Sequence, residues 1–263
     1  MCRHLAYLGP ARTLYELVVA PPHSLLRQSY APADMRGGGT INADGFGIGW
    51  YTDGRAQPSR YRRACPMWAD ETLPDLMRDL RSSAVLAAVR SATVGMPVVE
   101  TAAAPFRTGR WLFSHNGVLP GWPGSVEALA ETLPVRDLTT LDAPTDSALL
   151  WALLRARLEA GEDPVKAVGQ LVLDAVRLDP AARMNLLLTD GRQLVATAWY
   201  HALSVIAGED FVAVSSEPWD DDPRWRAVPD RHLVTATVGE RGPVVELCPF
   251  DEKPGPVEES QGA

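Results

Sequence analysis

The sequence predicts an α+β fold in which two antiparallel sheets pack face to face between helices, as a four-layer αββα sandwich. Short apolar runs follow one another in groups rather than alternating strictly with helical patterns, which disfavours a doubly wound parallel sheet. Two hairpin-like turns, Thr189–Arg192 and Ala207–Asp210, separate the later runs and favour antiparallel pairing. The chain has 263 residues, 46% of them hydrophobic, so it can bury a sizeable core.

The predicted strands are short apolar runs with turn residues between them, the pattern expected of strands that are at least half buried. In chain order they are Cys2–Leu8, Gly45–Tyr51, Val85–Arg90, Trp111–Ser114, Met184–Leu188, Leu194–Trp199, Leu203–Ala207 and Phe211–Ser215.

Segments with helical periodicity are the predicted helices: Glu71–Arg81, Ser125–Thr132, Asp146–Glu159 and Pro164–Val176. In the third, an apolar stripe is formed by Leu149, Leu150, Leu153, Leu154 and Leu158. Asp146 lies in its first turn, where a carboxylate suits the positive end of the helix dipole. We expect one domain over residues 1–251 and a disordered tail over residues 252–263, which are polar and contain Pro and Gly.

The formal net charge of −8 argues against nucleic acid as a partner, because binding it requires Lys and Arg to neutralise phosphates. Cationic partners are mildly favoured instead. No apolar run approaches the roughly 20 residues of a membrane span, and the start has no secretion-signal pattern. The three cysteines, Cys2, Cys65 and Cys248, have no CxxC spacing. We therefore expect neither a zinc cluster nor a disulfide framework, and a cytoplasmic location.

Cys2 directly follows Met1, so removal of the methionine would leave one residue with both a thiol and a free α-amine. Ordinary thiols and α-amines both titrate close to neutral pH, so the amine can take the thiol proton and return it to a leaving group. The small side chain of cysteine is compatible with methionine removal. The alternative is an incidental buried thiol, and this position alone does not decide between the two.

The segment Asp44–Tyr51 carries Gly45, Gly47 and Gly49 at every second position, which places the glycines on one face of a strand. Such a face admits close approach of another backbone or of a ligand. The spacing is not GxGxxG, so it does not indicate a dinucleotide site. Tight packing of the sheet explains the same pattern without a ligand.

Arg90 ends the buried-looking strand Val85–Arg90. A guanidinium does not readily lose its charge, so in the interior it needs an anionic partner. That partner is either a substrate carboxylate, held by two parallel hydrogen bonds, or a carboxylate of the protein in an internal salt bridge.

The segment Phe113–Leu119 contains His115, Asn116 and Gly117. Asn-Gly after a strand is ordinarily a turn. An asparagine amide and a glycine N–H brought to one point would instead form an oxyanion hole. His115 is either a general base or a structural histidine.

Thr145 and Asp146 precede and open the third predicted helix, and either side chain can cap it. The alternative for Asp146 is that its carboxylate faces a pocket and binds a substrate ammonium.

Together these segments resemble the class II glutamine amidotransferases, a family of N-terminal nucleophile (Ntn) hydrolases. That family has an N-terminal Cys followed by a DGxGxGWY-like strand, an R-x-A-T segment, H-N-G and a D-S pair, and this chain has all of them in that order. The later predicted strands suit the αββα sandwich of the family. The resemblance implies that Cys2 is the nucleophile and its amine the base. It also implies that Asn116 and Gly117 form the oxyanion hole, and that the glutamyl α-carboxylate and α-amine are held by Arg90, Thr93 and Asp146.

The chain also differs from the ammonia-transferring members, with Ser91 where those commonly have Trp and Val94 where they have His. The stretches Leu86–Pro97, Gln28–Pro32 and Pro229–Val234 look like the ergothioneine-biosynthesis branch of the family. That branch removes the γ-glutamyl group from γ-glutamyl-hercynylcysteine sulfoxide. No synthase domain follows the glutaminase-like part, so liberated ammonia would have no acceptor within this chain.

The resemblance therefore implies a hydrolase that acts on a small γ-glutamyl substrate through a thioester, with no cofactor, no metal and no obligate protein partner. The trimethylammonium group of that substrate suits an aromatic face, for which the candidates are Trp50, Trp68, Trp122, Trp219 and Trp225. The acidic segment Ser215–Asp222 either lines that part of the pocket or is a solvated loop. Two other functions stay open: a glutaminase subunit that supplies ammonia to a separate synthase, and a γ-glutamyl-binding module without turnover.

Overall fold

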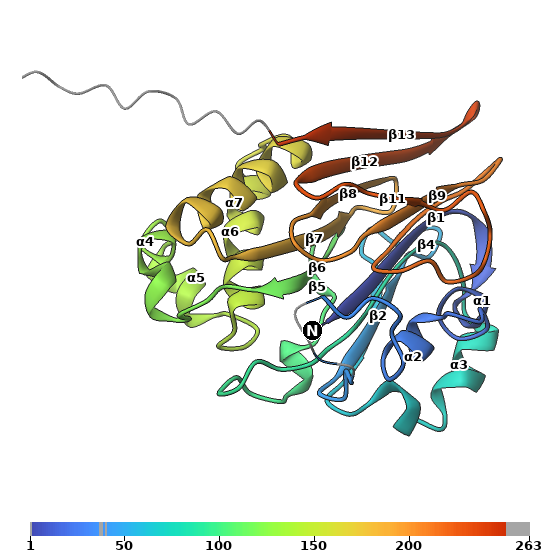
Figure 1. The fold of residues 1–263 in the computed structure, drawn as a ribbon, viewed down its shortest axis with the longest axis horizontal. Helices are drawn as coiled ribbons and strands as arrows, with labels where there is room; N and C mark the ends of the chain where they lie inside the picture. Colours follow the sequence, from blue (N-terminus) through green and yellow to red (C-terminus); the bar gives the residue numbers. More distant parts are fainter. Residues whose placement is uncertain (1, 37–38, 40, 251–263) are drawn as a thin grey trace, which may run out of the picture.

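Two antiparallel sheets lie face to face, with helices on their outer sides (Figure 1). The computed structural model describes residues 2–36, 39 and 41–250, so Met1 and the tail predicted over residues 252–263 lie outside the described residues. One sheet has the strand order β11-β9-β10-β1-β4-β2-β3, and the other has the order β13-β12-β8-β7-β6-β5. The predicted α+β sandwich is confirmed.

The seven-stranded sheet consists of β1 (Arg3–Thr13), β2 (Phe46–Trp50), β3 (Ser59–Arg63), β4 (Arg81–Val89), β9 (Ser204–Ala207), β10 (Val212–Ser215) and β11 (Arg226–Ala227). The six-stranded sheet consists of β5 (Phe106–Thr108), β6 (Trp111–Val118), β7 (Arg183–Thr189), β8 (Gln193–Ala198), β12 (His232–Gly239) and β13 (Gly242–Pro249). The two predicted hairpins are present, since β7 pairs with β8 and β9 with β10, both antiparallel.

The α-helices are α1 (Leu14–Val18), α2 (Leu25–Gln28), α3 (Leu73–Asp79), α4 (Glu127–Ala130), α5 (Val135–Thr139), α6 (Asp146–Glu159) and α7 (Pro164–Leu178). Short 3-10 turns cover Met67–Ala69, Glu100–Ala102 and Gly124–Val126. None of the helices in the described part of the chain combines the length and the apolar character required to cross a bilayer.

Buried side chains hold the four layers together in three clusters. The cluster between the sheets includes Ala6, Leu86 and Leu112, from β1, β4 and β6. A second cluster joins the outer face of the seven-stranded sheet to α1–α3, and a third joins the outer face of the six-stranded sheet to α6 and α7. Because side chains alternate along a strand, β1 contributes to two clusters, with Leu5 on the outer side and Ala6 on the inner side.

Two of the predicted helices are shorter than expected. The segment Glu71–Arg81 is helical only over Leu73–Asp79, because Arg81 already pairs with Thr13 as the first residue of β4. The segment Ser125–Thr132 divides into a 3-10 turn and the four-residue α4. By contrast, α6 has the predicted bounds and α7 extends the prediction to Leu178.

The glycine face of β2 packs against protein. A Cβ atom on Gly47 would overlap the carbonyl oxygen of Ala104, and one on Gly49 would lie 2.6 Å from Leu112 Cδ1. Real Cβ atoms do not approach other heavy atoms so closely, so β2 needs glycine for the tight packing of the sheet, the explanation that requires no ligand.

Candidate active site

Cys2 lies at the start of β1 and at one end of the sandwich, where β1, β4 and β6 come together. Its Sγ is 3.8 Å from the carbonyl oxygen of Ser91, to which the thiol is placed to donate. With Arg90, Ser114, His115 and Ser147, it lines a small cavity of about 20 Å³. The structure therefore brings Cys2 and Arg90, which are far apart in the sequence, to one cavity.

Arg90 follows directly after β4 and its backbone is fixed by two hydrogen bonds. Its N–H donates to the carbonyl of Gly45 at 2.7 Å, and its carbonyl accepts from the N–H of Asp44 at 3.0 Å. The side chain is only 8% exposed, and Nη1 donates to the carbonyl of Pro97 at 2.9 Å. Within residues 2–36, 39 and 41–250, no carboxylate forms an ion pair with this guanidinium. The internal salt bridge is thus not found in that part of the chain.

Asn116 is fully buried within β6, on the same face as Ser114 and Leu112, which points toward the other sheet. Neither its Nδ2 nor its Oδ1 has a hydrogen-bond partner among the described residues. A buried amide without partners costs about 1–3 kcal/mol for each unsatisfied group, so such groups are rare outside functional sites. The amide is therefore available to a ligand that enters between the sheets.

Gly117 continues β6 rather than forming a turn. A Cβ at this position would overlap the carbonyl oxygen of Arg183 on β7 and crowd the ring of His115. Only glycine permits this approach of β6 to β7, so the Asn-Gly pair is part of a strand and the expectation of an ordinary turn is wrong.

His115 is 3% exposed and both of its ring nitrogens are engaged. Nε2 lies 2.9 Å from the carbonyl oxygen of Arg183, to which it donates, and Nδ1 lies 3.0 Å from Ser147 Oγ. This arrangement fixes the ring between β6 and α6. The structural alternative for His115 accounts for these contacts.

Asp146 is 4% exposed and opens α6. The helix cap itself is Thr145, whose Oγ1 accepts from the N–H of Ala148 at 3.2 Å. The carboxylate of Asp146 accepts from two backbone N–H groups, those of Leu119 at 3.1 Å and Ser147 at 2.7 Å. Asp146 thereby ties the segment after β6 to the start of α6, and a carboxylate retains lone pairs for a further donor.

Thr93 is exposed and does not line the cavity at Cys2. It begins a turn in which its carbonyl accepts from the N–H of Met96 at 2.9 Å, and Gly95 takes the positive φ of +90° that such a turn requires. Thr93 lines a neighbouring cleft of about 300 Å³ with Leu119 and Trp122. The two cavities have no lining residue in common, although Thr93 is in the loop that follows Arg90.

The buried ion pair of Arg3, the residue after Cys2, was not predicted from the sequence. Arg3 is 2% exposed, and its Nη2 pairs with Glu217 Oε1 at 3.1 Å. Glu217 also accepts from the N–H groups of Ala33 at 2.8 Å and Asp34 at 3.2 Å. Burial lowers the pKa of Arg3, an effect opposed by the charge of Glu217. The available signal was a charged residue inside an apolar strand, which requires a buried partner.

His4 fixes the other side of the same strand. Its Nδ1 lies 3.1 Å from Ser114 Oγ on β6, and its backbone N–H donates to Ser216 Oγ at 3.0 Å. Complete burial lowers the pKa of His4 to about 3, with smaller contributions from His115, His201 and Arg3. His4 is therefore neutral near pH 7 and links the two sheets beside the candidate nucleophile.

The part of the chain that the structure describes contains no group of three or more His, Cys, Asp or Glu side chains able to hold a metal ion. Of the site residues predicted from the sequence, Cys2 and Arg90 line the same small cavity, whereas Asn116, Gly117, Thr93 and Asp146 are not among its lining residues.

Comparisons with known proteins agree on one family. Residues 24–211 match the model of glutamine amidotransferases class II. The chain is 44% identical to the γ-glutamyl-hercynylcysteine sulfoxide hydrolase of Mycolicibacterium smegmatis, over 89% of this chain and 95% of that protein. It is 41% identical to the protein of the same name from Mycobacterium tuberculosis CDC 1551, over 97% and 100% of the two chains. A class II glutamine aminotransferase domain protein from Silicibacter pomeroyi has the same fold, with a TM-score of 0.66, 22% identity and coverage of 93% and 98%.

Proposed function

Because the chain belongs to the class II glutamine amidotransferases, we propose that it hydrolyses the γ-glutamyl amide bond of γ-glutamyl-hercynylcysteine sulfoxide. The products are glutamate and hercynylcysteine sulfoxide, in ergothioneine biosynthesis. Two hydrolases of that name are 41–44% identical over nearly the full length of both chains, which supports the substrate as well as the reaction class. We place this reaction in the cytoplasm and assign it no cofactor, since its steps need only a thiol, an amine and water.

The observation that carries the proposal is the buried, unpartnered amide of Asn116 on the inward face of β6. An amide without a partner among the described residues supports a role in stabilising charge that develops during reaction, because a preorganised donor costs no reorganisation. Asn116 Nδ2 and the N–H of Gly117 are the proposed donors to the oxyanion.

Cys2 is the proposed nucleophile, and its α-amine, freed by removal of Met1, is the proposed base. The amine takes the thiol proton while Sγ attacks the γ-carbonyl carbon. As the tetrahedral intermediate collapses, the C–N bond breaks and the amine returns the proton to the departing cysteinyl nitrogen. Water then attacks the γ-glutamyl thioester, the C–S bond breaks, and glutamate leaves with the thiol restored.

The glutamyl part of the substrate is bound through its α-groups in this proposal. Arg90, which has no ion pair with a carboxylate of the described residues, is suited to hold the α-carboxylate by two parallel hydrogen bonds. Asp146 complements the α-ammonium. Thr93 borders the neighbouring cleft and is proposed to contact the same end of the substrate.

The test compares two substrates with the purified protein after Met1 has been removed. Glutamate release is measured from γ-glutamyl-hercynylcysteine sulfoxide and from glutamine at matched subsaturating concentrations, together with ammonia. We expect a higher kcat/KM for the sulfoxide, with each ~1.4 kcal/mol of differential stabilisation giving about tenfold. Cys2→Ala should be inactive, and Cys65→Ala, the change of another free cysteine, should retain activity.

Each alternative function has its own outcome in this assay. Faster hydrolysis of glutamine, especially when a synthase partner accelerates it, would reject the sulfoxide hydrolase in favour of an ammonia-supplying subunit. Binding of the sulfoxide with no glutamate release by the processed protein would indicate a module without turnover.

A further inference from the structure

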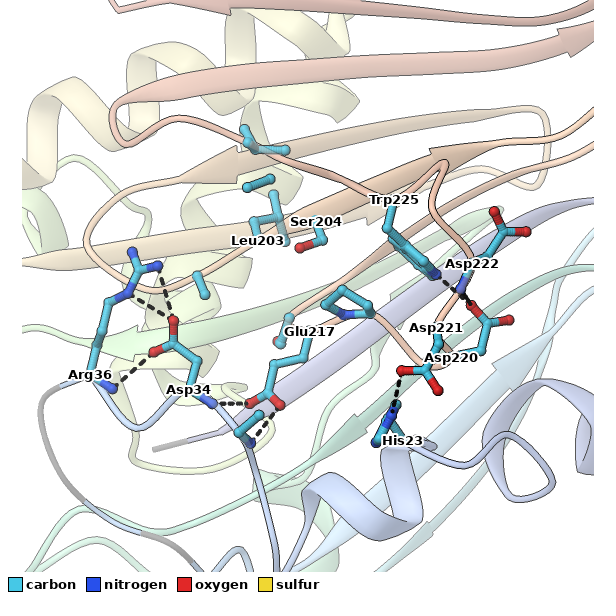
Figure 2. A pocket seen from close by; sticks show the side chains of 16 residues that line it. His23, Asp34, Arg36, Leu203, Ser204, Glu217, Asp220, Asp221, Asp222 and Trp225 are labelled. Atoms are coloured by element: carbon cyan, nitrogen blue, oxygen red, sulfur yellow. Dashed lines mark hydrogen bonds and ion pairs between the residues drawn. The ribbon is translucent and has the colours of Figure 1, made fainter.

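A second, larger cavity lies beside the start of β1, with a volume of about 560 Å³. Figure 2 shows Asp34 and Arg36 at one end, Trp225 with Asp220–Asp222 at the other, and Ser204 and Glu217 between them. Cavities of this size hold small organic molecules. The cavity is separate from the small one that Cys2 lines.

This cavity is connected by direct contacts to the two residues that follow Cys2. Glu217, in its wall, pairs with Arg3 at 3.1 Å, and the carbonyl of Asp34, also in its wall, accepts from the same guanidinium. Ser216 lines the cavity and accepts from the N–H of His4. The walls are therefore anchored on Arg3 and His4, the two residues that follow Cys2.

The walls carry an excess of negative charge. Five carboxylates and one guanidinium line the cavity. Glu217 and Asp222 are paired with Arg3 and Arg224, and Asp34 is paired with Arg36. That leaves Asp220, which accepts from the indole N–H groups of Trp219 and Trp225, and Asp221, whose Oδ1 lies 3.1 Å from Nε2 of His23 in the same wall; neither has a Lys or Arg partner among the described residues. This residual charge favours a cationic ligand.

Trp225 adds an aromatic surface at the acidic end. Its indole N–H donates to Asp220 Oδ1 at 2.7 Å, and its ring meets that of Trp219 edge to face at 5.2 Å. These two contacts fix the orientation of the Trp225 ring in the cavity wall. A held aromatic ring beside carboxylates suits a quaternary ammonium, which has no N–H to donate and binds through its charge.

Ser204 adds a polar group to the cavity wall. The residue is only 7% exposed and lies between the acidic end and Glu217 (Figure 2). Its hydroxyl is not one of the fully buried polar atoms without a partner in the described residues, so it is open to water or to a polar group of a bound molecule.

We propose that this cavity is the leaving-group subsite and that Trp225, with Asp220 and Asp221 beside it, binds the trimethylammonium group of the histidine-betaine half of the substrate. The inference rests on the proposed function, since that function supplies a substrate with such a group. Of the tryptophans that the sequence offered for this role, Trp225 is in this cavity, whereas Trp122 lines the cleft beside Thr93.

Two measurements separate the subsite from the function. Binding of histidine betaine to the full chain is measured by titration calorimetry, with L-histidine as the probe that lacks the methyl groups. Hydrolysis is measured separately for the sulfoxide conjugate and for glutamine. We expect Trp225→Leu to weaken betaine binding, and kcat/KM for the conjugate, by about tenfold, the loss of one cation–π contact, while glutamine hydrolysis is unchanged.

Matched variants show whether the aromatic face is responsible. Trp225→Phe retains the face without the indole N–H and should recover most of the betaine binding. Trp111→Leu removes a tryptophan from a different surface cavity, beside Arg110, and should change neither measurement.

Betaine affinity that does not depend on Trp225, in a protein that does hydrolyse the conjugate, would overturn the subsite and leave the function standing. Equal losses on the conjugate and on glutamine would also overturn it, because they would show a general disturbance of the fold. Betaine binding that depends on Trp225, without hydrolysis of the conjugate, would support the subsite and reject the function.

Discussion

The two residues that follow Cys2 are held by contacts on both faces of β1. Arg3 is bound to Glu217 on one face of β1, and His4 contacts Ser114 on the other. The thiol itself points to the carbonyl of Ser91 in the loop after β4. Because Arg3 and His4 are held in place, the position of the nucleophile depends on the fold.

The free amine of Cys2 gives the first prediction. If that amine is the base, protein that retains Met1 should have no measurable turnover, whereas processed protein should be active. Intact mass spectrometry reports the state of the N-terminus, and glutamate release is measured on the same samples. Full activity in a sample verified to retain Met1 would contradict the mechanism and would direct attention to His115.

We expect substitutions of Asn116 and of Arg90 to change the kinetics in different ways. Asn116→Ala should lower kcat by roughly 10²–10³-fold with little change in KM, because it removes a donor that acts in the transition state. Arg90→Lys keeps the charge but loses the bidentate geometry, so it should raise KM and lower kcat together. Steady-state kinetics on correctly folded variants separates the two patterns. Wild-type kinetics for Arg90→Ala would assign that residue a purely structural role.

At the residue scale, the sequence indicated Cys2, Arg90, Asn116 and Asp146 because each belongs to a short local pattern. The structure brings Cys2 and Arg90 to one cavity, whereas Asn116 and Asp146 do not line that cavity and Thr93 lines a different cleft. The partnership of Arg3 with Glu217 was beyond sequence reasoning, because no local spacing connects β1 to the loop after β10.

Among the elements, β2 shows how glycine at every second position permits close packing of the sheet. Gly47 faces the backbone of Ala104, which is fixed, whereas Gly49 faces the end of the Leu112 side chain, which can adjust. We expect Gly47→Ala to lower the free energy of unfolding by about 1–3 kcal/mol or more, and Gly49→Ala by less. Urea unfolding measures both. Gly239→Ala, in a strand position with open space around it, is the control. Equal stabilities for the Gly47 and Gly49 variants would contradict this interpretation.

The strands that the sequence predicted are buried enough to have a recognisable apolar pattern. The central strands β1, β4, β7 and β10 read as apolar runs because both of their faces are covered. The prediction missed the four edge strands β3, β5, β11 and β13, and it also missed β12, an internal strand with a mixed burial pattern that lies between β13 and β8. Edge strands have one neighbour and less burial, so their pairing depends on the sheet rather than on their own sequence.

Over the whole molecule, the end of the sandwich that holds the site also holds two buried neutral histidines. His4 bridges the sheets, and His201 lies close to Asn185 of β7, which accepts from its backbone N–H at 3.1 Å. Burial lowers the pKa of each to about 3; His4 is further affected by His115 and His201 by Arg183. The cohesion of the two sheets is therefore linked to the protonation of groups inside the fold.

This linkage gives a pH dependence of stability with a definite sign. In the unfolded chain a histidine takes up a proton near pH 6.5, whereas in the folded protein His4 and His201 do so only near pH 3. Between pH 3 and pH 6.5 the unfolded state binds more protons than the folded state. The two histidines therefore leave the free energy of unfolding at its full value above pH 6.5 and lower it progressively as the pH decreases toward 3. At pH 5, each of the two histidines should have lowered the free energy of unfolding by about 2 kcal/mol. Urea unfolding at pH 8, 7, 6 and 5 measures this loss of stability.

His4→Gln, which keeps a polar group near Ser114, should reduce the loss of stability by about half. His232→Gln, at a half-buried position, should leave it unchanged. Identical pH profiles for His4→Gln and the wild-type protein would show that His4 does not carry this linkage.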